Sequence, residues 1–401
     1  MKYDAIVVGA RCAGAPTAML LARKGYDVLL VDRAIFPSNM VQSTHLIHNS
    51  GIAYLKRWGL LQEIEERCTA FNRWTFDLHG VALTAELPPV EGVDLSYAPR
   101  RQMLDDILVR AAERTGVEVR EGCRVTNLTF ENDRVCGIQA KSPSGKKFTE
   151  SAQIVIGADG AASIVARCAK ADERECEPIA QSVLWTYYTD LPIDHFMLYS
   201  REHAGAFAFP CNDGIVVIAA NLTYEDFITA KADRDRAFRD MLDHVVPEIA
   251  EMLAEGQQVD RLFAGCTRMF VREAYGPGWA LVGDAGMKKD PISAQGIAVA
   301  FEYAQKLADA IDEGLAGRCD LGLALRVYEQ ERDDRLMPFY DFTVELAKLA
   351  KPTPEQLALY RALQGKPDDI GQLFGCVTLA VSPDEFFAPD NIARIAGTAS
   401  L

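Results

Sequence analysis

The sequence predicts an α/β fold in which a mainly parallel sheet is joined to a second domain of α+β type and to a helical C-terminal segment. Three observations carry this prediction. Residues 2–33 read as a strand, a tight turn, a helix and a second strand; residues 175–270 contain short strands rich in aromatic side chains; residues 319–401 are mostly helical in pattern. A chain of 401 residues is long enough for two or three domains.

The N-terminal unit has the spacing of a dinucleotide site. After an apolar strand at residues 5–8, Gly9 and Gly14 occupy the first and third glycine positions of G-x-G-x-x-G. The first glycine allows the sharp exit from the strand, the third lets the helix pack closely, and the N–H groups of the first helical turn face a diphosphate. Asp32 ends the second strand, where a carboxylate accepts hydrogen bonds from a ribose. This unit alone does not distinguish NAD from FAD.

Arg11 stands at the middle position of the turn, where a glycine normally lets the backbone approach phosphate. We expect either a slightly displaced ligand or a contact between the guanidinium and the diphosphate. Cys12 and Ala13 complete the turn and Arg33 follows Asp32, so these residues belong to the predicted cofactor site. The start of a helix lowers a thiol pKa, but we interpret the ten cysteines, which include no C-x-x-C pair, as small buried apolar residues.

Composition limits the classes of partner. The formal net charge of −15 argues against nucleic acid and against an anionic membrane surface. Met1 is followed almost immediately by the first strand, which leaves no room for a signal peptide, and no apolar run reaches the length of a membrane span. We therefore expect a cytoplasmic protein, a monomer or homodimer, that acts on a small molecule.

Residues 34–130 contain three further features. His45 and His48 precede an amphipathic helix at 50–57, and their spacing would suit a metal only with further ligands that are not nearby. The two histidines would otherwise form hydrogen bonds with local backbone groups or lie beside a cofactor. Residues 70–99 alternate as hairpins, and Arg100 and Arg101 then open a helix, where an anionic ligand would offset their unfavourable interaction with the helix dipole.

Later segments supply two more motifs. A buried strand at 153–156 ends in Gly157-Ala158-Asp159-Gly160, and a strand before residue 283 ends in Gly283-Asp284, followed by Pro291, Gly296 and a helix beginning near Ser293. Between them, residues 175–270 predict an antiparallel sheet whose aromatic residues form a core or line a cavity, followed by one helix at 237–253. One long helix is expected at about 321–349.

With three motifs in this order, the chain resembles the FAD-dependent oxidoreductases of the p-hydroxybenzoate hydroxylase type, whose wider relatives include aromatic monooxygenases, flavin halogenases and geranylgeranyl reductases. The resemblance covers residues 1 to about 335. It implies a Rossmann-like FAD-binding domain of the glutathione-reductase type at 1–70, 97–172 and 272–318, a substrate-binding domain at 71–96 and 173–271, and a helical region at 319–401.

The resemblance also implies roles for single residues. Asp32 would hold the adenosine ribose, Arg101 or its neighbour Arg100 the diphosphate, and Asp284 the ribityl chain. Asp159 and Gly160 would serve FAD and the transient approach of NADPH or NADH. Independently, a helix starting near Ser293 directs its positive end at an anionic reduced flavin. The full predicted cofactor set is Gly9, Arg11, Cys12, Ala13, Gly14, Asp32, Arg33, Arg101, Val125, Asp159, Gly160, Gly283, Asp284, Pro291, Gly296 and Ile297.

Three departures from the family pattern affect this set. Arg11 replaces a glycine, Ala162 and Ala166 stand where relatives often carry arginine, and GDAGMKKDP has no histidine after Gly-Asp-Ala. These departures affect the contacts to the phosphates of the cofactor and the side chains around the flavin ring.

The leading function is an FAD-dependent, NAD(P)H-using monooxygenase that hydroxylates a small aromatic or related secondary metabolite through a C4a-peroxyflavin. His48 or His45 would deprotonate a phenol, and Tyr187 or Tyr188 would orient the substrate. Reduction of a C–C bond is the first alternative, although STHLIH replaces the cysteine-containing segment of the prenyl reductases. Halogenation would need the W-x-W-x-I-P segment and a lysine, which are not recognisable, and a non-catalytic flavoprotein is the last alternative.

Overall fold

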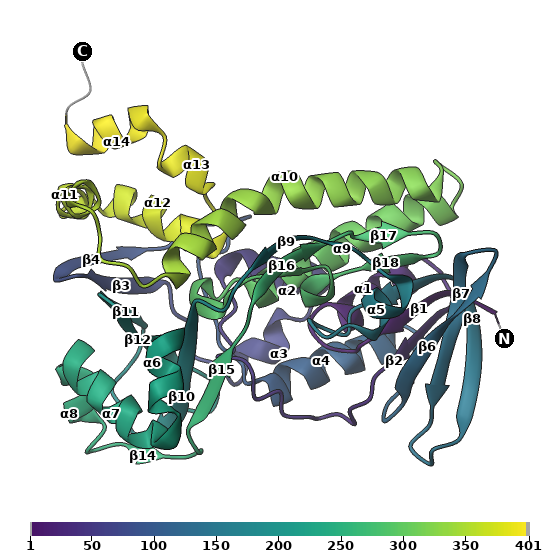
Figure 1. The fold of residues 1–401 in the computed structure, drawn as a ribbon, viewed down its shortest axis with the longest axis horizontal. Helices are drawn as coiled ribbons and strands as arrows, with labels where there is room; N and C mark the ends of the chain where they lie inside the picture. Colours follow the sequence, from purple (N-terminus) through teal and green to yellow (C-terminus); the bar gives the residue numbers. More distant parts are fainter. Residues whose placement is uncertain (1, 398–401) are drawn as a thin grey trace.

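Two eight-stranded sheets organise residues 2–397, the part of the chain that this computed structural model describes (Figure 1). In the first sheet the strand order is β17-β18-β8-β1-β2-β5; β18, β8, β1, β2 and β5 run parallel to one another, and β17 is antiparallel to β18. The strands β6 and β7 extend β8 as an antiparallel meander. The strands are β1 (Lys2–Val8), β2 (Val28–Val31), β5 (Glu118–Arg120), β6 (Arg124–Glu131), β7 (Arg134–Lys141), β8 (Lys147–Gly157), β17 (Tyr275–Gly276) and β18 (Trp279–Leu281).

Both faces of this sheet are covered, which explains the unbroken apolar run of its first strand. Ala5 and Val7 pack on a core to which several helices contribute, whereas Ile6 and Val8 pack on the opposite side with residues of β6, β7 and the short helix α5. The helices are α1 (Gly14–Arg23), α4 (Arg101–Arg114), α5 (Ile164–Ala169) and α9 (Gly296–Leu315). Helices α2 (Asn49–Trp58) and α3 (Leu61–Glu65) lie between β2 and the second sheet in sequence. The predicted α/β class is confirmed.

The second sheet has the order β14-β10-β13-β12-β11-β3-β4, with β15 also paired to β10. All its pairs are antiparallel except β11 with β3. Its strands are β3 (Arg73–Leu78), β4 (Val81–Glu86), β10 (Gln181–Thr189), β11 (Phe196–Arg201), β12 (Ala204–Pro210), β13 (Val216–Thr223), β14 (Gln257–Gln258) and β15 (Phe263–Cys266).

The two faces of this sheet have different neighbours, and β10 shows the alternation. Trp185 and Tyr187 belong to an inner aromatic cluster, whereas Leu184 and Tyr188 face the helices α6 (Tyr224–Thr229), α7 (Arg234–Val245) and α8 (Pro247–Met252). A 3-10 turn, η1 (Ala230–Ala232), lies between α6 and α7. The single helix predicted at 237–253 was wrong: it is interrupted at Val246, because Pro247 cannot donate a backbone hydrogen bond and begins a new helix.

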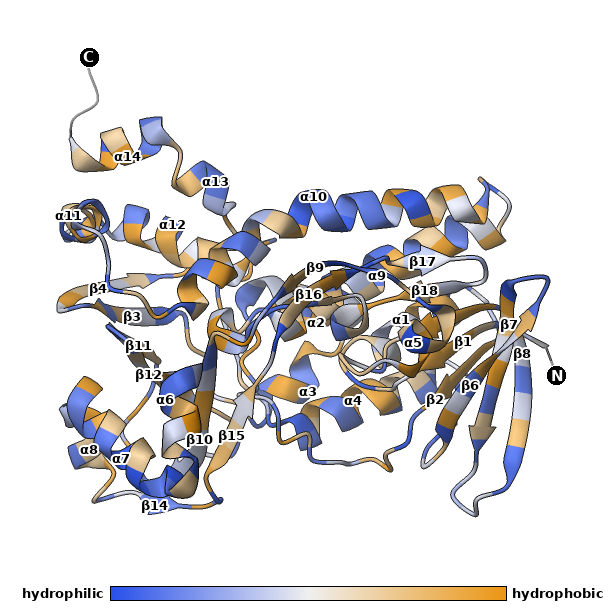
Figure 2. Cartoon of the chain, in the orientation of Figure 1, coloured by the Kyte–Doolittle hydropathy of each residue, from blue (hydrophilic) through white to orange (hydrophobic). Residues whose placement is uncertain are grey.

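The helical C-terminal segment covers the β3–β4 hairpin (Figure 1). The long helix α10 (Leu321–Ala347) ends two residues before the predicted boundary. Leu363, Phe374 and their neighbours then pack on Trp74 and Phe76 of the hairpin. The helices are α11 (Pro354–Leu363), α12 (Pro367–Thr378), α13 (Pro383–Phe386) and α14 (Pro389–Ala396). Figure 2 shows hydrophilic residues along much of α10 and apolar residues in the central strands such as β1.

A small third sheet connects the segments around the two large ones. Its order is β19-β16-β9, with β9 (Glu173–Glu177), β16 (Met269–Arg272) and β19 (Met287–Lys288). Strands β9 and β16 begin and end the long insertion that carries most of the second sheet, and β19 follows Gly283-Asp284. The insertion is therefore tied to a predicted cofactor motif at its base. Within residues 2–397 no helix combines the length and the apolar character that crossing a membrane requires.

Candidate active site

The three separated motifs contact one another at the carboxyl ends of the parallel strands. Gly9 has φ +100°, and a Cβ there would lie 2.4 Å from the Ala158 carbonyl oxygen. A Cβ on Gly14 would lie 1.7 Å from the Gly9 oxygen, and one on Gly283 would lie 2.8 Å from the Ala13 Cβ. The three glycines are therefore required by close packing between the motifs, and this edge of the sheet is where open α/β sheets bind ligands.

Asp32 is 8% exposed, and its carboxylate joins the glycine turn to the segment after β2. One oxygen accepts the Ala10 N–H at 2.7 Å and the other accepts the Ala34 N–H at 2.7 Å. Each oxygen keeps a further lone pair, so a ribose contact remains compatible with these bonds. Arg33 is exposed. Val125 is buried in β6, two residues after Cys123, whose N–H donates to the Asp32 carbonyl oxygen at 2.8 Å.

Arg11 and Arg101 share one carboxylate. Asp105 is fully buried, lies 2.5 Å from Arg11 Nη1, and accepts from Arg101 Nε at 2.9 Å. Arg100 bonds Asp260 instead, at 2.7 Å, with its guanidinium 4.5 Å from the centre of the Tyr187 ring. Asp260 therefore balances the charge of Arg100, whereas Arg11 and Arg101 share a single carboxylate and keep a net positive charge beside the glycine turn.

Cys12 lies beside this cluster, with its Sγ 3.6 Å from an Asp105 oxygen. Burial raises the pKa of the Cys12 thiol to about 12, and this outweighs the lowering expected at the start of a helix. The thiol is protonated at neutral pH. Ala13 is the N-cap residue of α1 and is buried.

His45 connects the start of α4 to the second sheet. The Arg101 N–H donates to His45 Nδ1 at 3.3 Å, so Nε2 carries the proton and donates to Tyr187 Oη at 2.6 Å; this tautomer follows from the donors present. Tyr187 Oη in turn donates to the Ser43 carbonyl oxygen at 3.3 Å. Burial, with Arg101 and Arg100 adding to it, lowers the pKa of His45 well below its usual value. His45 is a neutral donor whose lone pair is already occupied.

His48 has a free acceptor. Its Nε2 donates to the Ser293 carbonyl oxygen at 2.9 Å, and its Nδ1 is buried without a hydrogen-bond partner among the described residues. Burial lowers the pKa of His48 to about 4, so the ring is neutral at pH 7. Tyr187 is placed with His45, whereas Tyr188 lies on the opposite face of its strand. His48 and Tyr187 are therefore the predicted catalytic residues with a polar atom suited to a substrate.

The Asp159 carboxylate is engaged with the protein. It accepts from Ser163 Oγ at 2.5 Å and from the Ile164 N–H at 2.6 Å, at the start of α5. Gly160 has φ +78°, and a Cβ there would meet open space. Asp159 therefore orders the turn after β8, and Gly160 leaves that side of the turn accessible.

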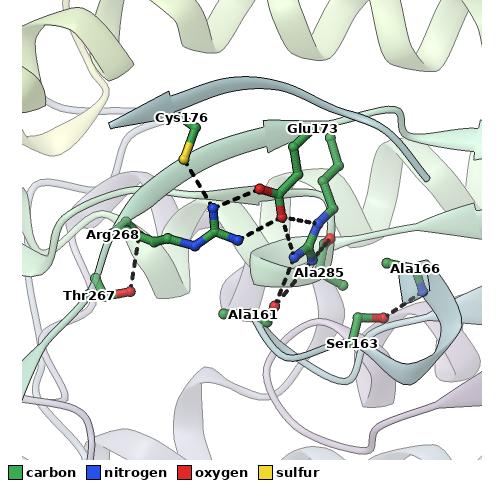
Figure 3. Close-up of polar contacts among 9 residues, drawn as sticks. Ala161, Ser163, Ala166, Glu173, Cys176, Thr267, Arg268 and Ala285 are labelled. Atoms are coloured by element: carbon green, nitrogen blue, oxygen red, sulfur yellow. Dashed lines mark hydrogen bonds and ion pairs between the residues drawn. The ribbon is translucent and has the colours of Figure 1, made fainter. Parts of the chain in front are cut away.

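The sequence analysis missed a group that joins two cofactor motifs (Figure 3). The Arg272 side chain is 11% exposed and donates to the carbonyl oxygens of Ala161, at 3.2 Å, and Ala285, at 3.0 Å. Glu173 lies 2.8 Å from Arg272 and bonds Arg268 through both oxygens, at 2.7 and 2.8 Å. Arg268 holds the pKa of Glu173 below its usual range. The alternation of charged residues in β9 was the one available indication of this group.

We expect Glu173→Gln to destabilise the protein by about 2 kcal/mol, because two guanidinium groups lose a charged acceptor. Urea unfolding followed by circular dichroism measures this effect. Glu255→Gln, at an exposed position, is the matched control. A free energy of unfolding equal to that of wild type would show that Arg272 holds Ala161 and Ala285 without Glu173.

The last motif leads into the N-terminus of α9. The helix begins at Gly296 and not near Ser293, because the 3-10 turn η3 (Pro291–Ser293) and Ala294, at φ +50°, precede it. Asp284, in the turn η2 (Gly283–Ala285), lies 2.7 Å from Lys288 Nζ. A Cβ on Gly296 would meet open space, while Ile297 is buried. Gly296 is exposed at the start of α9, so a ligand that approaches there meets backbone without a side chain in the way.

Similarity to known proteins supports FAD as the cofactor of this chain. The model of a family described as an FAD binding domain matches residues 2–343. A tryptophan 2-halogenase from Chondromyces crocatus is 24% identical over 81% of this chain, which spans 64% of that enzyme. A digeranylgeranylglycerophospholipid reductase from Methanosarcina acetivorans is 27% identical over 82% of this chain and 80% of its own length.

Solved structures share the fold. The flavin-dependent brominase Bmp2 superposes with a TM-score of 0.83 at 18% identity, covering 99% of this chain and 98% of its own. PqsL, a probable FAD-dependent monooxygenase from Pseudomonas aeruginosa, has a TM-score of 0.73 at 21% identity, covering 94% and 99%. The resemblance inferred from the three motifs is confirmed: the chain belongs to the FAD binding domain family and is an FAD-dependent oxidoreductase.

Proposed function

We propose that this oxidoreductase is an NAD(P)H-using monooxygenase that hydroxylates a small aromatic metabolite. The observation that carries the proposal is the buried pair of His45 and Tyr187, which joins the cofactor side of the molecule to an aromatic sheet face. Trp185, Phe209 and Phe263 lie in the same cluster. Aromatic neighbours with few polar atoms among them, here Tyr187 Oη and Trp185 Nε1, suit a flat ring that carries a hydroxyl or amine.

The cofactor residues have complementary tasks in this proposal. Gly9 and Gly14 form the turn that would receive the diphosphate, Asp32 would hold the ribose, and the N-terminus of α9 at Gly296 would stabilise negative charge on the ring. Bound FAD supplies hydride acceptance from NAD(P)H and the activation of oxygen. Asp159 and Arg272 act on the protein side, because they order the turns after β8 and β18.

The substrate side would be organised by two polar atoms. Burial raises the pKa of the Tyr187 hydroxyl, so it stays protonated. Its hydrogen is donated to the Ser43 carbonyl oxygen and one lone pair accepts from His45, so the other lone pair is able to accept a hydrogen bond from a substrate hydroxyl or amine. His48 Nδ1 is able to accept a hydrogen bond from a substrate hydroxyl, which increases the electron density of the ring to be oxidised. His45 is not the base in this scheme, because its lone pair is held by the Arg101 N–H.

Coupled turnover tests the proposal. The holoprotein is supplied with NADPH or NADH and a panel of phenols, anilines and indoles, and oxygen uptake, hydrogen peroxide and product mass are measured together. We expect one aromatic class to give a product heavier by one oxygen atom, in proportion to the NAD(P)H consumed. Peroxide as the sole product with every compound would contradict the proposal. A product with two added hydrogens would indicate a reductase, and a halogenated product in bromide or chloride would indicate a halogenase.

Replacing His48 by asparagine separates its role from that of the cofactor. We expect product formation to slow by about 100-fold, the usual effect of losing a positioned proton acceptor, while flavin reduction by NAD(P)H changes little. Stopped-flow absorbance measures reduction, and quenched samples measure product. His203→Asn is the matched control, since its side chain is 67% exposed and asparagine tolerates its φ of +65°. Equal slowing of both steps would contradict the proposed role.

A further inference from the structure

We propose that Arg11 is a positioning residue that connects the cofactor turn to the His45–Tyr187 pair and slows the release of FAD. The proposal rests on membership of the FAD binding domain family and is independent of the reaction catalysed. Arg11 occupies the middle position of the turn, where a glycine would leave no side chain, so the guanidinium needs an explanation of its own.

The first connection runs through α4. Arg11 Nη1 lies 2.5 Å from Asp105 Oδ2, and Arg101 donates to the same carboxylate from Nε and Nη2 at 2.9 and 3.1 Å. The backbone N–H of Arg101 donates to His45, which bonds Tyr187. Because Asp105 is fully buried, both guanidinium groups are held at fixed positions by it. The side chain of Arg11 therefore helps to fix the start of α4, against which His45 rests.

The second connection runs through the segment after β2. Arg11 Nη2 donates to Ser38 Oγ at 3.0 Å, and its guanidinium lies 5.5 Å from the centre of the Phe36 ring. Phe36 is itself held by a bond from its N–H to Glu121 at 2.7 Å. Residues 39–42 make no hydrogen bond among the described residues, and Ser38 is thus the last anchored residue before Ser43.

Both connections end at the same place. Ser43 Oγ accepts the His45 N–H at 3.1 Å, and the Ser43 carbonyl oxygen accepts from Tyr187. The segment between Ser38 and Ser43 follows β2 at the carboxyl edge of the sheet, beside the glycine turn. This is the edge at which ligands of α/β sheets bind, so freeing the segment opens the cofactor site on that side.

The chemistry of these contacts requires arginine. A guanidinium presents donors in a fixed planar fork, so one group is able to bond Asp105 and Ser38 together and to lie against the Phe36 ring. A lysine would supply the charge for Asp105 from a single ammonium but would not hold both partners in this geometry. Lysine at position 11 therefore separates the charge of Arg11 from its bridging role.

Three variants of the holoprotein test the proposal: Arg11→Gly, Arg11→Lys and Ser38→Ala. The readouts are the rate of FAD dissociation, from the recovery of flavin fluorescence, and hydrogen–deuterium exchange of the hydrogen-bonded amides at the two ends of the segment, those of Phe36, His45 and Ile47. Visible circular dichroism of the bound flavin reports its environment, and the thermal midpoint reports the fold. None of these measurements needs a substrate, so failure of the hydroxylation proposal would leave them unchanged.

We expect Arg11→Gly to release FAD about tenfold faster, to increase exchange of the Phe36, His45 and Ile47 amides and to lower the thermal midpoint, because the buried Asp105 loses one of its two arginines. Arg11→Lys should regain most of the thermal midpoint but keep the fast exchange. Ser38→Ala should reproduce the faster exchange and release, by about threefold, with an unchanged midpoint. Wild-type exchange and FAD release in both Arg11→Lys and Ser38→Ala would overturn the proposal, as would unchanged release in Arg11→Gly.

Discussion

Gly14→Ala is expected to prevent folding of the N-terminal unit, whereas Gly296→Ala is expected to leave the fold intact and to weaken FAD binding alone. The two glycines lie at the starts of α1 and α9, and their surroundings are opposite. A Cβ on Gly14 would lie 1.7 Å from a backbone oxygen of Gly9, which cannot move without displacing the turn. A Cβ on Gly296 would have no neighbour within 4 Å, and the residue has ordinary helical geometry.

In the protein without FAD, the two substitutions change the free energy of unfolding in opposite directions. The Gly14 variant must separate β1 from α1, which loses packing in the core that contains Ala15 and Ala18 and costs several kcal/mol. The Gly296 variant gains about 0.5–1 kcal/mol, because alanine has less freedom to lose in a helix. Its methyl group would occupy space that the proposed flavin approaches, and we expect at least about tenfold weaker binding, or about 1.4 kcal/mol.

Expression yield, circular dichroism and FAD titration distinguish the two variants. A folded Gly14→Ala protein that binds FAD would contradict the packing argument. A Gly296→Ala protein with wild-type affinity for FAD would place the ring away from the start of α9. Gly317→Ala, at φ +72° in a turn away from the three motifs, is expected to cost stability through backbone strain and to leave the affinity for FAD unchanged, so it controls for a loss of stability without a change at the site.

The N-terminal unit was predictable because its signals are local. The strand, the turn, the helix and Asp32 follow one another within a short stretch, and their spacing depends only on backbone geometry. The break at Val246 was predictable in principle from Pro247, but the apolar periodicity on either side suggested one helix. The start of α9 at Gly296 depended on Ala294, whose positive φ no sequence pattern indicated.

The partners of the charged site residues were not predictable, because they lie far away in sequence. Arg100 bonds Asp260, in the connection between β14 and β15, and Arg272 bonds Glu173 across the third sheet. Arg101 pairs with Asp105 at a helical spacing that the sequence did contain, and this pair explains its burial without a ligand. A charge at a helix start therefore indicated an unidentified partner, and the structure adds a carboxylate of the protein beside each of the two arginines.

Acidification from pH 6.5 to pH 4 is expected to destabilise the protein through its buried histidines, and Asp290 is expected to oppose them. Burial lowers the pKa of His48 from 6.5 to about 4, so in this range the unfolded chain binds a proton that the folded chain does not. Stability therefore falls as the pH falls, by about 3 kcal/mol for His48 at about 1.4 kcal/mol per pKa unit. His45, whose pKa burial also lowers, acts in the same direction.

Asp290 changes the pH dependence of stability in the opposite direction. Burial raises its pKa from 3.8 to about 6, so the folded protein takes up a proton before the unfolded chain does and gains about 3 kcal/mol between these values. We therefore expect Asp290→Asn to lose stability more steeply than wild type on acidification, and His48→Asn to lose it less steeply. Urea unfolding at fixed FAD concentration between pH 4 and 7 measures both slopes. The same slope in all three proteins would mean that neither group keeps a shifted pKa. Burial disfavours the charged form of each group, which is the protonated form of histidine and the deprotonated form of aspartate. The slopes of the two variants must therefore differ from that of wild type in opposite directions.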